Sequence, residues 1–223
     1  EPVRECAKFN AKSMVRTGNK RYLFDIGQNI SGYVRLKVRQ KSGDVITIRY
    51  AEQINSDNAL QLNRMDTFFP QSPFQTDKFI CNGEDFTWSP LFVYHGFRYI
   101  ELDGVTEPDI NMVSGIFIHL DVKTISFFEC SNPYLNHLFK LGQMATLSNL
   151  HHIPTDCPTR EKLGWANDAQ ASTEQMLINF DTIKFFEKWL VDIEDSIRDD
   201  GAIPGIIPSS GWGYEWGTGP VSS

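Results

Sequence analysis

The hydrophobic pattern of this chain changes its period once, and this change constrains the fold more than any other feature. In the first half apolar and polar residues alternate, as in "GYVRLKVRQ", where Val34, Leu36 and Val38 share one face. Such alternation is typical of strands that bury one face. After "FFECSNP" the apolar residues recur at three- and four-residue intervals, as in helices. The sequence therefore predicts an α+β multidomain chain, with an antiparallel β-sandwich domain over residues 1–126 and a helical domain over residues 127–223.

Several short strands with turn signals between them are predicted in the first domain. The turn "KSGD" separates "GYVRLKVRQ" from "VITIRYAE", and "GFRYIELDG" and "NMVSGIFIHLDV" predict two further strands. Asn82-Gly83 lies between two strand-like runs, and this dipeptide favours the positive φ angles of a tight hairpin. Short strands at regular spacing, divided by Gly, Pro and Asn, are typical of an antiparallel β-sandwich.

Three helices are predicted in the second domain. Asn132-Pro133 is a start signal for the first, because Asn caps helices and Pro is favoured in the first turn. The second is expected to begin near Asn167 or Asp168, and the third to end before Gly201. The predicted apolar stripes, each on one face of its helix, are Leu135, Leu138, Leu141 and Ala145 on the first helix, and Ile183, Phe186, Leu190, Ile193 and Ile197 on the third.

The last residues, 201–223, are rich in Gly, Pro and Trp and show no period, so an ordered loop is predicted there. Three helices cannot close a large helical domain. We therefore expect the second domain to be incomplete in these residues.

Charge and composition exclude some classes of partner. The net charge is −7, and Lys and Arg are scattered rather than gathered in a stripe, so nucleic acid is not expected as a partner. No run approaches the ~18 consecutive apolar residues of a spanning helix, so no membrane partner is expected. The four cysteines form no CxxC and neither require nor exclude disulfides, which leaves both a cytoplasmic and a periplasmic or secreted location open. The oligomeric state is not indicated.

The run "DCPTREKLGWANDAQ" carries three carboxylates, Asp156, Glu161 and Asp168, together with Trp165. One interpretation is structural, because an Asp before a helix is usually a cap and a Glu in a loop is usually solvated. The other interpretation is chemical. Pro158 and the Gly-Trp bend make the run a rigid loop that leads into a helix N-terminus, and functional groups are often displayed on such loops.

The chemical interpretation gives the carboxylates different roles. Asp168, at a helix N-terminus, is expected to be held ionised by the helix dipole and to accept hydrogen bonds from substrate hydroxyls. Glu161, in mid-loop near Trp165 and crowded by two aspartates, is suited to keep a proton and to donate it. This division of roles is the logic of glycosidic bond cleavage, in which a carboxylic acid protonates the leaving oxygen.

The run resembles the signature D-C-P-x-R-E-x-L-G-W-x-x-D of the bacterial α-L-rhamnosidases of glycoside hydrolase family 78. "FDIGQNISGYVRLKV", "ITIRYAE" and "LFVYHGFRYIELDG" resemble the β domain that precedes the catalytic (α/α)6 barrel in those enzymes, and "DGAIPGIIP" with "GWGYEWGTGP" resembles the next barrel segment. The likeness covers the chain from about Tyr22 to its end. It implies that residues 127–223 are the N-terminal part of an (α/α)6 barrel. It also implies hydrolysis of terminal non-reducing α-L-rhamnose residues with inversion.

Carried over by position, the resemblance makes Glu161 the general acid. The substrate-binding residues that it implies are Asp156, Trp165, Asp168, Trp212 and Trp216. In many relatives a further acidic residue precedes this Glu. The spacing between Asp156 and Glu161 therefore departs from the family pattern, whereas Glu161, Trp165 and Asp168 keep it. The resemblance implies no cofactor and no metal, and a rhamnose-containing glycoside or polysaccharide as partner. The general base of an inverting enzyme is expected beyond Ser223, so we expect the 223 residues alone to be inactive.

Two other kinds of function stay open. A non-catalytic carbohydrate-binding β-sandwich module would keep its sugar affinity after deletion of everything beyond Cys130. A structural domain without a ligand would lose only stability when the carboxylate run is changed. His95 and the pair His151-His152 lack the spacing of a metal site, so they are predicted to be structural.

Overall fold

The structure is a computed structural model that describes residues 1–62, 74–209 and 211–216. Of the loop predicted over residues 201–223 (the aromatic loop), residue 210 and residues 217–223 lie outside this part of the chain. Within the described residues, no helix combines the length and the hydrophobicity that crossing a bilayer requires.

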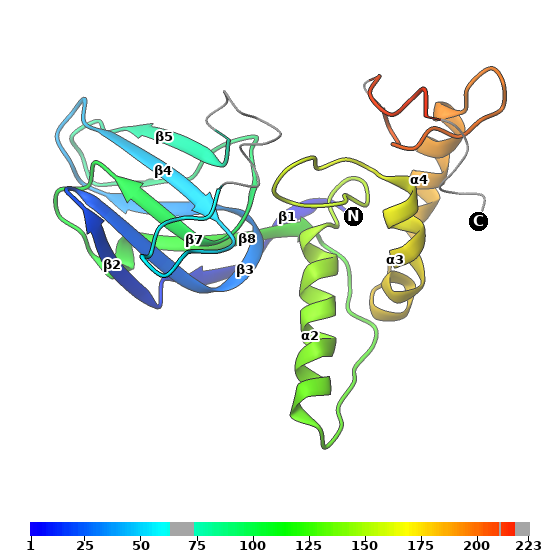
Figure 1. Cartoon of the computed structure of the whole chain (residues 1–223), viewed down its shortest axis with the longest axis horizontal. Coiled ribbons are helices and arrows are strands. Elements are labelled where there is room, and N and C mark those ends of the chain that lie inside the picture. Colours follow the sequence, from blue (N-terminus) through cyan, green and yellow to red (C-terminus); the bar gives the residue numbers. More distant parts are fainter. Residues whose placement is uncertain (63–73, 210, 217–223) are drawn as a thin grey trace. The chain divides into compact units, whose positions relative to one another are not determined.

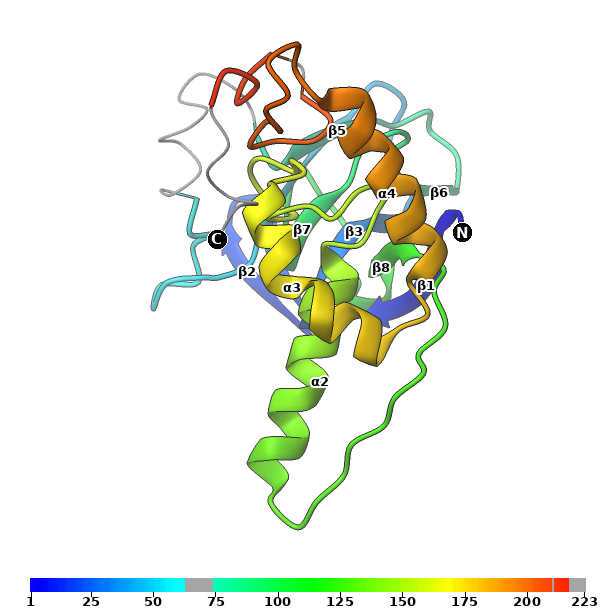
Figure 2. The ribbon, with the colours of Figure 1, turned by 90° about the vertical axis from the view of Figure 1, so that its right-hand side faces the viewer.

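Contacts divide the chain into two compact units. Residues 5–118 form one unit, and residues 1–4 together with residues 119–223 form the other. The strands lie mainly in the first unit and the helices in the second, which confirms the predicted fold class (Figure 1, Figure 2). The predicted domain boundary between residues 126 and 127 stays a prediction.

The first unit is built on a curled antiparallel sheet (Figure 1). One path through it runs in the order β1, β8, β3, β7, β4, β5, and both β2 and β6 pair with β3. A short 3-10 helix, Ile110–Met112, precedes β8. The strands are β1 (Val3–Asn10), β2 (Ser13–Gly18), β3 (Arg21–Val38), β4 (Val45–Ala51), β5 (Thr76–Ile80), β6 (Phe86–Trp88), β7 (His95–Asp103) and β8 (Val113–Leu120).

Strand β3 is long enough to take part in two regions of the sheet. Its first residues pair with β2 and β7, and its last residues pair with β8 and β6. The register against β7 shifts between Asp25 and Ile30, and Gly27 within this stretch has a φ of 76°. Glycine adopts this conformation without steric cost, and such bulges bend a strand and increase its twist. The irregularity therefore helps the sheet to curl around one core.

The inward face of the sheet forms the main core. Val34, Leu36 and Val38 are buried, whereas Lys37 and Arg39 are exposed, so the predicted alternation is confirmed. Burying a side chain of this size stabilises a fold by about 1.5–3 kcal/mol. The largest fully buried side chains of this unit are Tyr50, Phe24, Phe97, Ile26, Ile30, Leu36, Ile46, Ile48, Ile100, Leu102 and Ile116.

The prediction of a tight hairpin at Asn82-Gly83 was wrong. A turn does form, since Asn82 Oδ1 accepts a hydrogen bond from the Glu84 N–H (3.0 Å) and Gly83 has a φ of 92°. However, β5 pairs with β4 and β6 pairs with β3, so the turn joins strands that are not paired with each other. Local turn chemistry sets the turn, but side-chain packing across the sheet chooses the pairing partner.

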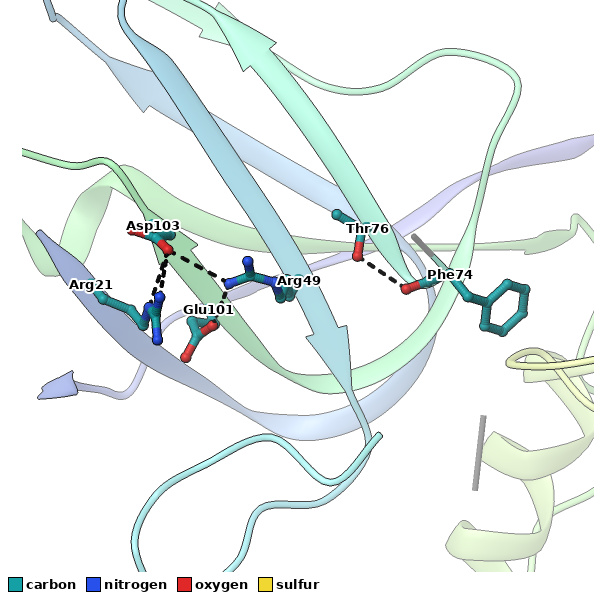
Figure 3. A network of polar contacts seen from close by, with 6 residues as sticks. All are labelled: Arg21, Arg49, Phe74, Thr76, Glu101 and Asp103. Atoms are coloured by element: carbon teal, nitrogen blue, oxygen red, sulfur yellow. Dashed lines mark hydrogen bonds and ion pairs between the residues drawn. The ribbon is translucent and has the colours of Figure 1, made fainter. Parts of the chain in front are cut away.

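Charged residues on adjacent strands form an ion-pair network (Figure 3). Arg21 donates two hydrogen bonds to Asp103 Oδ2 (3.2 and 2.8 Å), and Arg49 Nη1 lies 2.9 Å from Glu101 Oε1 and 3.8 Å from Asp103 Oδ2. The hydrogen bonds that Arg21 donates to Asp103 raise the pKa of Arg21. Arg21 stands opposite Asp103 in the register and Arg49 opposite Glu101. Partly exposed pairs contribute only about 0.2–1 kcal/mol each, so the network serves strand register more than overall stability.

The helices of the second unit are α2 (Pro133–Ser148), α3 (Ala166–Asn179) and α4 (Ile183–Ser196) (Figure 2). The predicted cap of α2 is confirmed, because Asn132 Oδ1 accepts a hydrogen bond from the Tyr134 N–H (2.9 Å). Helix α3 begins within a residue or two of its predicted start.

The predicted apolar stripe of α4 is packed only in part: Phe186 and Ile193 pack against the core clusters of this unit. Phe185 and Trp189 are buried, whereas Ile183 and Leu190 are 60% and 61% exposed. Helix α4 carries apolar residues around more than one face, so periodicity alone does not select the packed stripe. Packing in two small clusters determines which residues of α4 are buried. Phe185 packs with Leu120, Leu150 and Met176, and Trp189 packs with Ala166, Ala169 and Ile207.

Candidate active site

The loop between α2 and α3 is closed on itself by Asp156 and Leu163. The Asp156 N–H donates to the Leu163 carbonyl oxygen (3.0 Å), and the Leu163 N–H donates to Asp156 Oδ1 (2.9 Å). The Glu161 N–H donates to Cys157 Sγ (3.4 Å). Lys162 has a φ of 54°, a left-handed conformation that is uncommon for residues other than glycine and that recurs at functional sites. The loop therefore holds Glu161 on a fixed turn.

The carboxyl group of Glu161 is bound by the indole of Trp165. Trp165 Nε1 donates a hydrogen bond to Glu161 Oε2 (2.7 Å), and both side chains are partly buried. Within the described part of the chain, Glu161 Oε1 accepts no hydrogen bond. One carboxyl oxygen is thus fixed by the protein, and no described residue donates a hydrogen bond to the other.

Three tryptophans pack against one another, and one of them is Trp165, which binds this carboxyl group. The rings of Trp165 and Trp216 are stacked, with centroids 5.3 Å apart and an interplanar angle of 28°. Trp212 meets both edge-on, at 5.6 Å from Trp165 and 5.1 Å from Trp216. Trp212 and Trp216 remain 52% and 45% exposed. The aromatic cluster therefore presents ring surface to solvent beside Glu161, as a sugar-binding wall does.

A backbone pairing fastens the aromatic loop to the start of α3. Trp165 and Ile206 form an antiparallel bridge, the Ile207 N–H donates to the Gly164 carbonyl oxygen (2.8 Å), and the Ala166 N–H donates to the Gly205 carbonyl oxygen (3.0 Å). A Cβ atom at Gly164 would lie 2.0 Å from the carbonyl oxygen of Ile207. This close approach requires glycine at position 164.

Asp156 and Asp168 line a cavity of about 730 Å³ in the helical unit. Its walls come mainly from α2 and α3 and include Leu135 and Leu138, which are 47% and 63% exposed. Asp168 stands in the first turn of α3, where the helix dipole favours a negative charge. The predicted apolar stripe of α2 therefore faces this open, largely apolar cavity in part, and two carboxylates lie on its wall.

The predicted site residues fall into two groups. Glu161 lies with the three tryptophans, whereas Asp156 and Asp168 line the cavity, and neither Glu161 nor a tryptophan is among the described residues that line it. The two groups are linked through the backbone, because Asp156 closes the loop that carries Glu161. That they form one rhamnose site stays a prediction.

Cys157 and Gly164 shape the site and were not predicted to do so. The signal for Cys157 is its four-residue spacing from Glu161, which suits a contact across one turn. No local signal identifies Gly164 as a contact point, because its neighbour Ile207 belongs to a distant segment.

The histidines have structural surroundings. His151 is buried with Nε2 3.3 Å from the Ser148 carbonyl oxygen, and burial lowers the pKa of His151 to about 4. His95 is buried with its ring nitrogens 3.0 Å from Gln75 Oε1 and 3.1 Å from Asp77 Oδ2. Among the residues that the structure describes, no group of three or more His, Cys, Asp and Glu side chains could hold a metal ion.

Two family models match the chain. Residues 15–119 match the bacterial alpha-L-rhamnosidase concanavalin-like domain, and residues 123–221 match the bacterial alpha-L-rhamnosidase 6 hairpin glycosidase domain. The second match contains the carboxylate run and all three tryptophans of the cluster.

Proteins that are similar to this chain are also named alpha-L-rhamnosidases. An alpha-L-rhamnosidase of Formosa agariphila is 34% identical over 200 residues, which are 86% of this chain and 20% of that protein. The solved structure of Streptomyces avermitilis alpha-L-rhamnosidase complexed with L-rhamnose has a TM-score of 0.89 and 31% identity, and covers 94% of this chain and 20% of its own. That of alpha-L-rhamnosidase from Dictyoglumus thermophilum has a TM-score of 0.88 and 36% identity, with 98% and 24% covered. The chain thus spans about a fifth of the length of the curated relatives that it matches.

Proposed function

Because the chain belongs to the bacterial α-L-rhamnosidases of glycoside hydrolase family 78, we propose that it forms part of an enzyme that releases terminal non-reducing α-L-rhamnose from α-L-rhamnosides with inversion. The substrate is a rhamnose-containing glycoside or polysaccharide. The observation that carries the proposal is the carboxyl group of Glu161, fixed through one oxygen beside a partly exposed aromatic cluster.

Glu161 is the general acid in this proposal. Its proton passes to the glycosidic oxygen as the bond from that oxygen to the anomeric carbon breaks, and water adds to the anomeric carbon from the opposite face. A carboxyl group with one oxygen held by the protein and the other open to a ligand suits this transfer, because the reacting oxygen has to lie within hydrogen-bonding reach of the leaving oxygen.

The sugar is bound by rings and carboxylates together. Trp165, Trp212 and Trp216 offer flat apolar surface to one face of the rhamnose ring. Asp156 and Asp168 accept hydrogen bonds from its hydroxyl groups, which suits carboxylates on the wall of a cavity. An inverting enzyme also needs a second carboxylate that activates water. We expect this base in a part of the barrel outside these 223 residues.

The test is Glu161→Gln in the full-length protein that contains this chain. The amide has nearly the shape of the carboxyl group but carries no acidic proton, so hydrolysis of methyl α-L-rhamnoside should fall by about 10²- to 10⁴-fold. Hydrolysis of p-nitrophenyl α-L-rhamnoside should fall less, because this leaving group departs without a proton. Calorimetry should show L-rhamnose affinity within a few fold of the parent.

Glu187→Gln is the matched control, because it makes the same chemical change at an exposed position of α4 and should leave both rates unchanged. Retention of methyl rhamnoside hydrolysis by Glu161→Gln would overturn the assignment of the acid. Sugar binding that survives deletion of all residues after Cys130 would instead favour a carbohydrate-binding β domain.

A further inference from the structure

Both the backbone and the ring of Trp165 are held by neighbouring residues. Its backbone N–H donates to the Leu163 carbonyl oxygen (3.0 Å), its own carbonyl oxygen accepts from the Ala169 N–H (3.0 Å), and it bridges Ile206. The ring is stacked against Trp216 and so cannot turn freely. Trp165 is therefore a rigid donor group at the first turn of α3.

The indole N–H of Trp165 contacts a single oxygen atom of the Glu161 carboxyl group. Nε1 of Trp165 lies 2.7 Å from Oε2 of Glu161. An indole nitrogen can donate and cannot accept, so a protonated Glu161 must present its carbonyl oxygen there and carry its proton on Oε1. Once Oε1 has given its proton to the leaving oxygen, the same N–H stabilises the carboxylate. The contact thus selects the reacting oxygen and favours the product state of the transfer.

The backbone around Glu161 supports the same geometry. The Glu161 N–H is anchored on Cys157 Sγ, and the left-handed φ of Lys162 turns the chain immediately after the acid. The five residues from Glu161 to Trp165 are therefore held together by the side-chain hydrogen bond between the first and the last of them. A residue whose backbone N–H and carboxyl group are both held loses conformational freedom before substrate arrives.

We propose that Trp165 is a positioning residue for the general acid, holding Oε2 of Glu161 through its indole N–H so that Oε1 delivers the proton to the glycosidic oxygen. This inference rests on the proposed rhamnosidase function. In the proposed function the ring of Trp165 is a wall of the sugar site. The present inference gives the indole N–H a second, separate role, and the two roles predict different kinetics.

The experiment removes the N–H and keeps the ring. Trp165→Phe, and site-specific replacement of Trp165 by the indole isostere benzothienylalanine, are made in the full-length protein. The isostere preserves ring size and stacking, so it also serves if the Phe variant folds poorly. Values of kcat and KM are measured with two substrates. Methyl α-L-rhamnoside needs an acid to protonate its leaving group, whereas p-nitrophenyl α-L-rhamnoside needs little protonation of its leaving group.

A positioning role predicts that kcat for the methyl rhamnoside falls about tenfold or more beyond any fall for the p-nitrophenyl rhamnoside, while KM changes little. A wall role alone predicts a similar rise in KM for both substrates and an unchanged ratio of their kcat values, and this result would overturn the inference. Trp88→Phe is the control for the ring change, because Trp88 lies on β6 in the other unit.

Failure of this inference is distinguishable from failure of the proposed function. If Glu161→Gln keeps its methyl rhamnoside activity, the acid assignment itself is wrong whatever Trp165 does. If Glu161→Gln loses that activity but the isostere at position 165 does not, the acid stands and only the positioning role is lost.

Discussion

Asp156 has a structural task that can be separated from any contact with a sugar. Its Oδ1 accepts the Leu163 N–H and so closes the loop that carries Glu161. Asn keeps an acceptor oxygen at this position and Ala does not. Asp156→Ala should therefore lower the free energy of unfolding by about 1–2 kcal/mol, and Asp156→Asn by clearly less, in urea denaturation.

Binding measurements complete this prediction. If Asp156 also accepts a rhamnose hydroxyl, both variants should weaken L-rhamnose binding in the full-length protein, the Asn variant while its stability is nearly kept. Asp195→Ala, at an exposed position of α4, should change neither quantity. Equal destabilisation by Asn and Ala would contradict the role of Oδ1 in closing the loop.

His151 should make the stability of the chain depend on pH. Burial lowers its pKa to about 4, although the Ser148 carbonyl opposes this shift. In the unfolded chain the pKa is near its ordinary value of about 6.5. Between these two values the unfolded state binds more protons than the folded state, so stability falls as the pH falls through this range, by up to about 3 kcal/mol.

The measurement is urea denaturation between pH 7 and pH 4, compared with His151→Gln, which cannot ionise. The variant should lose less stability over this range than the parent, whatever its stability at pH 7. His137→Gln, at an exposed position of α2, should keep the parental slope. An unchanged slope in His151→Gln would show that His151 is not the group responsible.

At the scale of elements, the pairing of residues 164–166 with residues 205–207 joins α3 to the aromatic loop. Gly164→Ala would place Cβ 2.0 Å from the Ile207 carbonyl oxygen, so the two backbones must separate. We expect a loss of stability of about 1–3 kcal/mol or more, together with a change in tryptophan fluorescence as Trp165 and Trp216 part.

Gly142→Ala is the matched control for this change. A Cβ atom at Gly142 meets nothing within 4 Å in α2, and alanine is the better helix former, so stability should rise by about 0.5–1 kcal/mol. If both alanine variants are tolerated equally, the close contact at Gly164 does not limit the structure.

The elements that sequence predicts well are those whose signals are local. The cap at Asn132 and the alternation at Val34, Leu36 and Val38 each depend on neighbouring residues, and both are confirmed. The hairpin at Asn82-Gly83 was wrong, and the stripe of α4 was right only in part, because distant contacts select the strand partner and the packed residues. Their apolar residues fit more than one arrangement.

The candidate site also combines features with local sequence signals and features that depend on distant contacts. Its carboxylates and Trp165 could be found from the sequence because they share one short run. The contact of Trp165 with Trp216 could not, because it depends on the pairing of Ile206 with Trp165 across a long stretch of chain. Which carboxylate meets the indole depends in turn on how Leu163 closes the loop.

At the scale of the whole molecule, the two units differ in how well they bury apolar side chains. In the sheet unit Phe24, Tyr50, Phe97 and Leu102 are fully buried. Among the residues that the structure describes, the helical unit has two small clusters, and several of its large apolar side chains are exposed. These exposed side chains include Phe127, Tyr134, Leu135, Leu138, Leu141, Ile178, Ile183, Leu190 and Val191.

This difference predicts that the chain unfolds in two stages on heating, with the helical unit melting first. The apolar area removed from water sets most of a unit's stability, and more of the described large apolar side chains stay exposed in the helical unit than in the sheet unit. Differential scanning calorimetry of the chain should show two transitions. A polypeptide of residues 1–120 should keep the upper transition and lack the lower one.

Two core substitutions assign the transitions to the units. Leu102→Ala removes a fully buried side chain of β7 and should lower only the upper transition, whereas Met176→Ala removes a buried side chain of the Leu120 cluster and should lower only the lower one. Each change costs about 2–5 kcal/mol, enough to move a transition by several degrees. A single transition that both variants shift equally would mean that the sheet and the helices unfold as one cooperative unit.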